Sequence, residues 1–148
     1  MTLPGGERVN TSGGVTHYLG FGWSGQHGEP TASVGEGRRE VSFASGAALV
    51  VRRSAWDRVG GFDPDYFMYG EDLDLSLRLW LAGFAVGLEP GARVAHDYEF
   101  SKGAEKWFLL ERNRWLTVLG VYPRALLALT LPALLFSEIA LLVVAARG

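Results

Sequence analysis

The feature that most constrains this chain is an apolar run of 22 residues, Ala125 to Ala146, interrupted by Pro132 and Glu138. At 1.5 Å per residue, a helix of this length spans about 33 Å, enough for a hydrocarbon core of about 30 Å. A carboxylate near the middle costs about 2.5–3.5 kcal/mol, which the surrounding aliphatic side chains can outweigh. The run predicts a membrane helix over 125–146. The alternative is a buried helix, or a helical hairpin kinked at Pro132.

The residues before this run are basic and aromatic. Five basic and two acidic residues lie between Lys102 and Arg124, whereas Arg147 is the one charged residue after the run. This bias predicts that the preceding part of the chain lies on the cytoplasmic face of a membrane. Trp107, Phe108 and other aromatic residues among these charges predict an amphipathic interfacial helix within 102–124, broken by Pro123.

Composition excludes several classes of function. The chain has 148 residues, the size of one ordinary domain, and a formal net charge of −2, which is no footprint for nucleic acid. It has no Cys, which excludes disulfide frameworks, thiolate zinc sites and Cys nucleophiles. The first six residues lack the basic and apolar segments of a signal peptide.

The remaining sequence, 1–101, divides into two zones. Glycines punctuate residues 1–38 too often for long elements, so this zone is predicted to be mainly loop, in a chain that starts in the middle of a fold. Residues 39–101 are predicted to be a compact mixed α/β unit. Strands are expected at 41–43, 47–51, 84–88 and 93–96, and a short helix that Ser54 caps and Gly60-Gly61 ends.

Residues 71–82 are predicted to form a helix, although their leucines alternate as in a strand. Glu71 and Asp72 suit the positive end of a helix dipole, and Asp74 and Arg78 form an i,i+4 pair. Gly83 stands where a helix-terminating glycine is common. The apolar face is expected to hold Leu73, Leu77, Trp80 and Leu81.

A series of short motifs carries a family resemblance between residues 45 and 96. In chain order it contains Ser45-Gly46-Ala47, Arg52-Arg53, Gly60-Gly61-Phe62-Asp63, Glu71-Asp72-Leu73-Asp74-Leu75, Arg78, Gly83, Pro90 and His96. In order and spacing the series resembles the second half of the catalytic domain of inverting GT-A glycosyltransferases of family 2, the rhamnosyltransferase-like type. The resemblance covers about two-thirds of the chain, counting weaker matches at 10–25 and at Arg112-Asn113.

This resemblance implies an α/β fold: the second half of a GT-A, Rossmann-like domain over 1–101, followed by the two helices described above. It assigns the catalytic base to Asp72, with Glu71 orienting the acceptor. Inverting transfer is an in-line displacement that needs one carboxylate to take the proton of the acceptor hydroxyl. Without the resemblance, both acids could merely complement a helix dipole. The expected acceptor-binding residues are Gly46, Asp63, Tyr66, Phe67 and Tyr69, although the aromatic loop could equally be a core flap.

The leaving group of such a reaction is a nucleoside diphosphate, whose charge a divalent cation, Mg or Mn, usually neutralises. The resemblance implies that His96 completes a metal site shared with a nucleotide-binding half. A locally hydrogen-bonded histidine is the alternative. Arg52 and Arg53 could bind the diphosphate or simply flank a strand. His17 and His27, in glycine-rich loops, are expected to be exposed.

The first 35 residues contain Glu7 and Glu29 but no Asp, so nothing there resembles the Asp-any-Asp motif of a nucleotide-binding half. We therefore expect a fragment of a longer enzyme, inactive alone, whose parent transfers a sugar from a nucleotide sugar to a glycan or lipid-linked acceptor in cell-envelope polysaccharide synthesis. The first alternative is a non-catalytic, membrane-anchored glycan-binding or scaffold module. Others are a small membrane interaction protein and a metal hydrolase using Asp72, Asp74 and His96.

Overall fold

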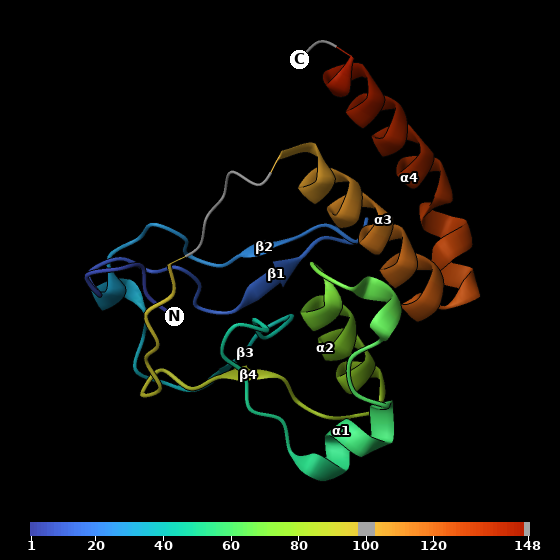
Figure 1. The fold of residues 1–148 in the computed structure, drawn as a ribbon. Coiled ribbons are helices and arrows are strands. Elements are labelled where there is room, and N and C mark those ends of the chain that lie inside the picture. Colours follow the sequence, from blue (N-terminus) through green and yellow to red (C-terminus); the bar gives the residue numbers. More distant parts are fainter. Residues whose placement is uncertain (98–102, 147–148) are drawn as a thin grey trace.

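The computed structural model describes residues 1–97 and 103–146, with the helices and strands arranged as in Figure 1. It has the mixed helix and strand content that the sequence predicts. The boundary expected at 101–102, and Arg147, lie outside the described residues. The elements are β1 (Gly14–Thr16), β2 (Gly22–Ser24), the 3-10 helix η1 (Thr31–Ser33), β3 (Arg39–Glu40), α1 (Arg53–Val59), the 3-10 helix η2 (Pro64–Tyr66), α2 (Glu71–Leu81), β4 (Gly87–Leu88), α3 (Gly103–Val121) and α4 (Arg124–Ala145).

The strands form two antiparallel pairs. In β1–β2, Val15 lies opposite Trp23, and in β3–β4, Arg39 lies opposite Leu88. A bridge between Gly14 and Phe43 connects the hairpin to the chain that follows β3. The prediction that 1–38 is mainly loop therefore missed a hairpin. Short pairings of this kind depend on residues distant in sequence, which local patterns do not report.

Four strand predictions need correction. The strand expected at 41–43 is β3 at Arg39–Glu40, and the one at 84–88 shrinks to β4. Residues 93–96 contribute a single bridge, from Ala95 to Thr2. The buried strand expected at 47–51 is absent, and Val50 is fully exposed. Within the described residues the strands make only two-stranded pairs, so the central parallel sheet of a GT-A fold is not among them.

Helix α2 confirms the predicted helix and its ends. It follows Gly70, and Gly83 after it has a φ of 84°. The expected pair is present, with Arg78 Nη2 2.6 Å from Asp74 Oδ2. The buried face differs from the prediction, since Leu75 and Leu79 enter the core while Leu81 is 65% exposed.

Helix α1 begins two residues earlier than expected, at Arg53, so Arg52 rather than Ser54 is its N-cap residue. Its Asp57 instead accepts a 2.8 Å hydrogen bond from Arg53 Nε. The predicted stop is confirmed, because Gly60 adopts a φ of 82° and its N–H donates to Trp56 O. A side chain at Gly61 is excluded sterically, since a Cβ there would lie 2.6 Å from the Trp56 ring.

Helix α3 crosses the end of the β1–β2 hairpin (Figure 1), where Arg114 Nη1 donates a hydrogen bond to Leu19 O in the hairpin turn. Its buried side is partly polar and includes Leu109, Asn113, Thr117 and Val118, whereas Trp107 near its start is 71% exposed. The predicted amphipathic helix is therefore present, but its buried side packs on the rest of the chain. Lys106 lies near the exposed Trp107 ring.

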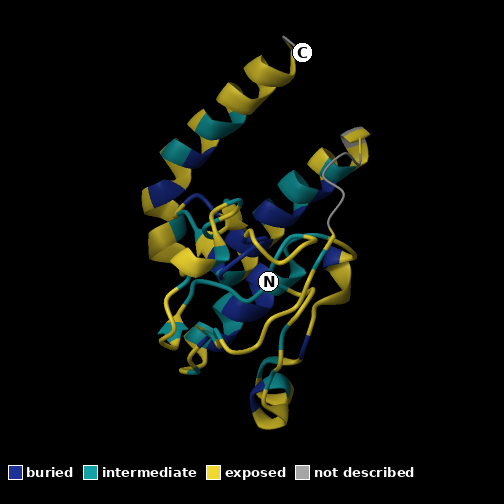
Figure 2. Ribbon diagram, turned by 90° about the vertical axis from the view of Figure 1, so that its left-hand side faces the viewer, coloured by how far each residue is buried: buried dark blue, intermediate teal, exposed yellow. Residues whose placement is uncertain are grey.

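Helix α4 starts after Pro123 and continues through Pro132, so the predicted long helix is confirmed and a hairpin kinked at Pro132 is not. Among the described residues it buries Thr130 and Leu134, and most of its length is exposed (Figure 2). By length and composition it is the one described helix that could cross a membrane, and 11% of its most apolar stretch is buried. Ten large apolar residues of this helix are exposed: Leu126, Leu129, Leu131, Leu135, Phe136, Ile139, Leu141, Leu142, Val143 and Val144.

Candidate active site

The first turn of α2 places Asp72 against the glycine turn at Gly46. Asp72 Oδ2 accepts a hydrogen bond from Gly46 N at 2.8 Å, and Oδ1 accepts one from Leu73 N at 2.8 Å. The carboxylate therefore lies at the positive end of the helix and uses one lone pair of each oxygen. The remaining lone pairs can accept a proton from a ligand.

Burial raises the pKa of Asp72, although the N–H groups of Gly46 and Leu73 act in the opposite direction. The pKa of Glu71 is also raised, first by burial, with the neighbouring charge of Asp72 adding to the effect. Glu71 Oε2 is buried and has no hydrogen-bond partner within the described residues. Two adjacent carboxyl groups thus hold protons more tightly than ordinary acids, a property suited to proton transfer.

Gly46 lies directly against both acids. A Cβ built on Gly46 would lie 3.4 Å from Asp72 Cβ, 3.5 Å from Glu71 Oε1 and 3.6 Å from Asp72 Oδ2. These are ordinary van der Waals separations, so a methyl group would be tolerated there. It would occupy space beside the carboxylates that a ligand hydroxyl could otherwise use.

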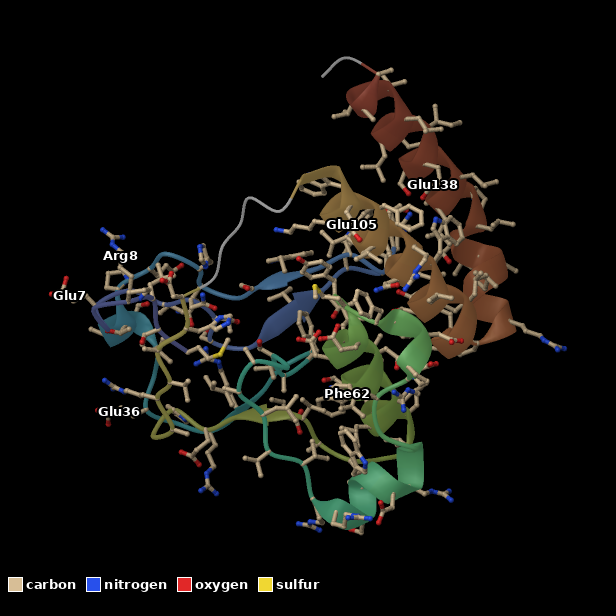
Figure 3. The ribbon with its side chains drawn as sticks, viewed as in Figure 1. Glu7, Arg8, Glu36, Phe62, Glu105 and Glu138 are labelled. Carbon is tan, nitrogen blue, oxygen red and sulfur yellow. The ribbon has the colours of Figure 1, made fainter. Side chains whose placement is uncertain are left out.

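The aromatic loop, residues 62–70, leads into α2. Asp63 Oδ1 accepts a hydrogen bond from Asp65 N and so caps η2. Phe67 is 76% exposed and Met68 is partly exposed. Tyr66 is 2% exposed, and its hydroxyl lies 3.0 Å from Thr117 Oγ1. Tyr66 is thus part of the interior, so the predicted acceptor contact does not fit it. Phe62, the first residue of this loop, is labelled in Figure 3.

Helix α3 supplies residues that hold this loop. Arg112 and Asn113 donate hydrogen bonds to backbone carbonyls between Asp65 and Tyr69. Arg112 and Asn113 are part of the family resemblance, but the sequence alone assigned no role to either. A buried Asn within a helix is the signal that could have indicated one, because a buried amide needs partners.

The predicted diphosphate ligands lie apart from this turn. Arg52 precedes α1, and the exposed Arg53 pairs with Asp57 at 2.8 Å. Neither has an observed contact with Glu71 or Asp72, so the structure groups Gly46, Glu71 and Asp72 without them.

His96 lies on the segment after β4, where its N–H donates to Thr2 O at 2.9 Å. Within residues 1–97 and 103–146, no group of three or more His, Cys, Asp or Glu side chains could hold a metal ion. The residues present therefore do not fit a divalent cation by themselves. Neither do they form the metal centre that a hydrolase using Asp72, Asp74 and His96 requires, since Asp74 is committed to Arg78.

A hollow of about 380 Å³ lies between the N-terminal segment and the turn at 88–93, and none of the predicted site residues lines it. The acidic turn around Asp72 is therefore not part of this hollow.

Comparison with known proteins identifies the family pattern. The family model described as "Glycosyl transferase family group 2" matches residues 13–146. The match includes the hairpin, the acidic turn of α2 and both C-terminal helices. No solved structure is significantly similar to the chain.

Several curated relatives share part of this region. An N-acetylglucosaminyl-diphospho-decaprenol L-rhamnosyltransferase of Mycobacterium tuberculosis (strain H37Rv) is 49% identical over 67 residues, 45% of this chain and 22% of that relative. Rhamnosyltransferase WbbL of Escherichia coli (strain K12) is 40% identical over 81 residues, 51% of this chain and 31% of the relative. An inactive polypeptide N-acetylgalactosaminyltransferase-like protein 5 of Macaca fascicularis is 40% identical over 53 residues, which are 35% of this chain and 12% of that relative. The chain thus matches less than a third of the length of each.

Proposed function

This chain belongs to glycosyl transferase family group 2, of the rhamnosyltransferase-like type, and we propose that it forms the acceptor-binding and base-bearing half of an inverting GT-A enzyme. The observation that supports this most is the state of Asp72. Its carboxylate is held at the start of α2 by two N–H groups, and its pKa is raised by burial.

In the proposed reaction, an acceptor hydroxyl oxygen attacks the anomeric carbon of a nucleotide sugar. The C–O bond to the diphosphate breaks as the new glycosidic bond forms, and the hydroxyl proton moves to an oxygen of Asp72. The raised pKa makes this carboxylate a stronger base than an ordinary Asp. Glu71, beside it, orients the acceptor through a hydrogen bond.

The donor nucleotide sugar is proposed to bind mainly outside the residues present here. Arg52 and Arg53 remain candidates for the diphosphate, and His96 for a Mg or Mn ion shared with another part of the enzyme. Because the described residues do not form a cation site, no step of the proposal runs through a metal.

The acceptor is proposed to be a lipid-linked sugar in cell-envelope polysaccharide synthesis, by analogy with the diphospho-decaprenol named for the M. tuberculosis relative. The exposed Phe67 presents an aromatic face suited to the C–H surface of a sugar ring. The apolar, largely exposed α4 is proposed to anchor the chain at the cytoplasmic face of the membrane.

A transfer assay tests this function. The protein in lipid would be incubated with nucleotide-activated rhamnose or other hexoses and an N-acetylglucosaminyl-diphospho-polyprenol, and the product's anomeric configuration determined by NMR. A glycolipid with an inverted anomeric centre is expected when the donor-binding part is supplied. A retained configuration would contradict the proposal.

One alternative has an observation in its favour. One relative that matches part of this chain is named as inactive, which indicates that a protein can contain this region without being a catalyst. A glycan-binding or scaffold module would bind the acceptor and lack transfer even in the presence of the donor-binding part. Titrating acceptor and nucleotide sugar separately distinguishes the two functions.

Gly46→Ala is expected to lower transfer by about 10- to 100-fold while the chain stays folded, because the methyl group displaces the acceptor hydroxyl from Asp72. Steady-state rates and circular dichroism check this. Gly35→Ala is the matched control, since a Cβ at Gly35 meets no atom within 4 Å. Equal rates for both variants would show that the space beside Gly46 is not used.

Placing two charges on the exposed side of α4, as Leu135→Arg with Ile139→Arg, is expected to lower binding to lipid vesicles more than tenfold, because each buried charge costs about 2.5–3.5 kcal/mol. Flotation of the protein with vesicles measures this. The control carries the same charges at two exposed apolar positions outside α4, Val50 and Leu81. If both proteins float alike, α4 does not enter the membrane.

A further inference from the structure

The backbone that leads into Asp72 is strained. Phe67 and Tyr69 have φ values of 57° and 70°, a region that residues other than glycine rarely adopt. Gly70, with a φ of 79°, follows and precedes the acidic turn. A segment in this conformation persists only where surrounding contacts hold it.

Asn113 of α3 supplies those contacts. Its Nδ2 donates to the carbonyl oxygens of Tyr66 at 3.0 Å, Met68 at 2.8 Å and Tyr69 at 2.5 Å. The side chain is almost fully buried, with the residue 1% exposed. The two hydrogens of one amide group thus serve three carbonyl oxygens of the loop, so one of them is shared.

Arg112 fixes the orientation of that amide. Its Nε donates to Asn113 Oδ1 at 2.9 Å, so the oxygen of the amide is occupied and the NH₂ group faces the loop. Arg112 Nη2 also donates to Asp65 O at 2.7 Å and Tyr66 O at 3.0 Å. The two α3 residues together bind nearly every carbonyl from Asp65 to Tyr69.

Asn113 also packs against the residue that precedes α2. A Cβ built on Gly70 would lie 3.6 Å from Asn113 Cβ. The start of α2 is therefore fixed from one side by Asn113, and from the other by the hydrogen bond between Gly46 and Asp72. Any shift of the loop would change how far Asp72 is buried.

We propose that Asn113 is a positioning residue, which holds the strained loop at 66–69 so that the carboxylates of Glu71 and Asp72 stay partly buried beside Gly46. It touches neither carboxylate and acts through the backbone. Its importance for sugar transfer rests on the function proposed above, but its effect on the acidic turn does not.

The test follows two amide protons by NMR in the 148-residue chain in detergent micelles. The Gly46 amide donates to Asp72, so its chemical shift against pH reports the ionisation of that carboxyl group. The Asp74 amide donates to Gly70 O at 2.9 Å and reports the first turn of α2. In Asn113→Ala, we expect the Gly46 titration midpoint to fall toward that of an ordinary Asp, because the carboxylate becomes more hydrated. Exchange of the Asp74 amide should be about tenfold faster.

Val118→Ala is the control, since Val118 is a fully buried α3 residue that packs against Leu19 and Leu134 instead of the loop. It should destabilise the chain without moving the Gly46 titration. If Asn113→Ala does not fold, Arg112→Gln decides the question, because it removes the bond that orients the amide and should move the midpoint in the same direction. If the Gly46 titration midpoint of Asn113→Ala equals that of Val118→Ala, the proposal is overturned. A shifted midpoint, together with no sugar transfer even when the donor-binding part is supplied, would leave Asn113 as a positioning residue and refute catalysis alone.

Discussion

Asp72→Asn is expected to lower sugar transfer by a factor of about 10² to 10⁴, the usual contribution of a general base. The amide keeps the shape of the carboxyl group but cannot take the acceptor proton. Acceptor binding should change little, because Glu71 and the aromatic loop stay in place. The measurement is kcat and KM for acceptor with the donor-binding part of the enzyme present.

Asp57→Asn is the matched control. It makes the same isosteric change on α1, where Asp57 is exposed and pairs with Arg53. Exposed pairs of this kind contribute less than about 1 kcal/mol, so both activity and stability should stay near those of the parent. Full activity in Asp72→Asn would remove this residue from the mechanism.

The raised pKa of Asp72 gives this variant a second expected property. Because the folded chain binds the proton more tightly than the unfolded chain, the contribution of Asp72 to stability is fully present below the ordinary carboxyl pKa. It is lost as pH rises through the raised pKa of the folded state. Asn does not titrate, so the free energy of unfolding of Asp72→Asn, relative to the parent, should increase over that window. Denaturant titrations at several pH values measure it.

The helix that carries Asp72 was predictable because residues at its two ends indicate where it begins and ends. Glu71 and Asp72 at the start and Gly83 at the end outweigh the strand-like alternation of the leucines. Which leucines are buried was not predictable in the same way. Leu75 and Leu79 face Ala55 and Val86, and that choice depends on neighbours distant in sequence.

The strands were the weakest part of the prediction for the same reason. Residues 47–51 have the composition of a buried strand, yet a strand requires a pairing partner. None lies beside them in the described residues, and Val50 is fully exposed. The grouping of Gly46 with Glu71 and Asp72 followed only from the family resemblance, because Gly46 and Asp72 are 26 positions apart in the sequence.

Glu138 illustrates how tertiary structure changes the interpretation of a local pattern. In the sequence it is a charge that a membrane helix must accommodate. In the structure it forms an ion pair with Arg114 of α3, on the side of α4 that faces that helix (Figure 3). The acid therefore serves to dock α4. The contact forms because the turn at Pro123 brings the two helices together. The residues next to Glu138 in the sequence do not indicate it.

Arg114→Met is accordingly expected to cause the largest loss of stability among the single substitutions considered, about 3–5 kcal/mol. The Arg114 side chain is 3% exposed and pairs with both Glu111 and Glu138. Its Nη1 also donates to Leu19 O at 2.7 Å, and its guanidinium lies 4.4 Å from the centre of the Phe21 ring. Removing it leaves two carboxylates and one carbonyl without their donor. Denaturant unfolding in micelles measures the loss.

Arg53→Met provides the contrast, because its ion pair with Asp57 is exposed and its removal should cost less than about 1 kcal/mol. Adding Glu138→Gln to Arg114→Met should recover part of the lost stability, since an uncompensated charge between α3 and α4 disappears. The distribution of distances between spin labels on α3 and α4 should become broader in Arg114→Met and narrower again in the double variant. Equal losses for Arg53→Met and Arg114→Met would mean that the buried cluster does not hold α4 to the rest of the chain.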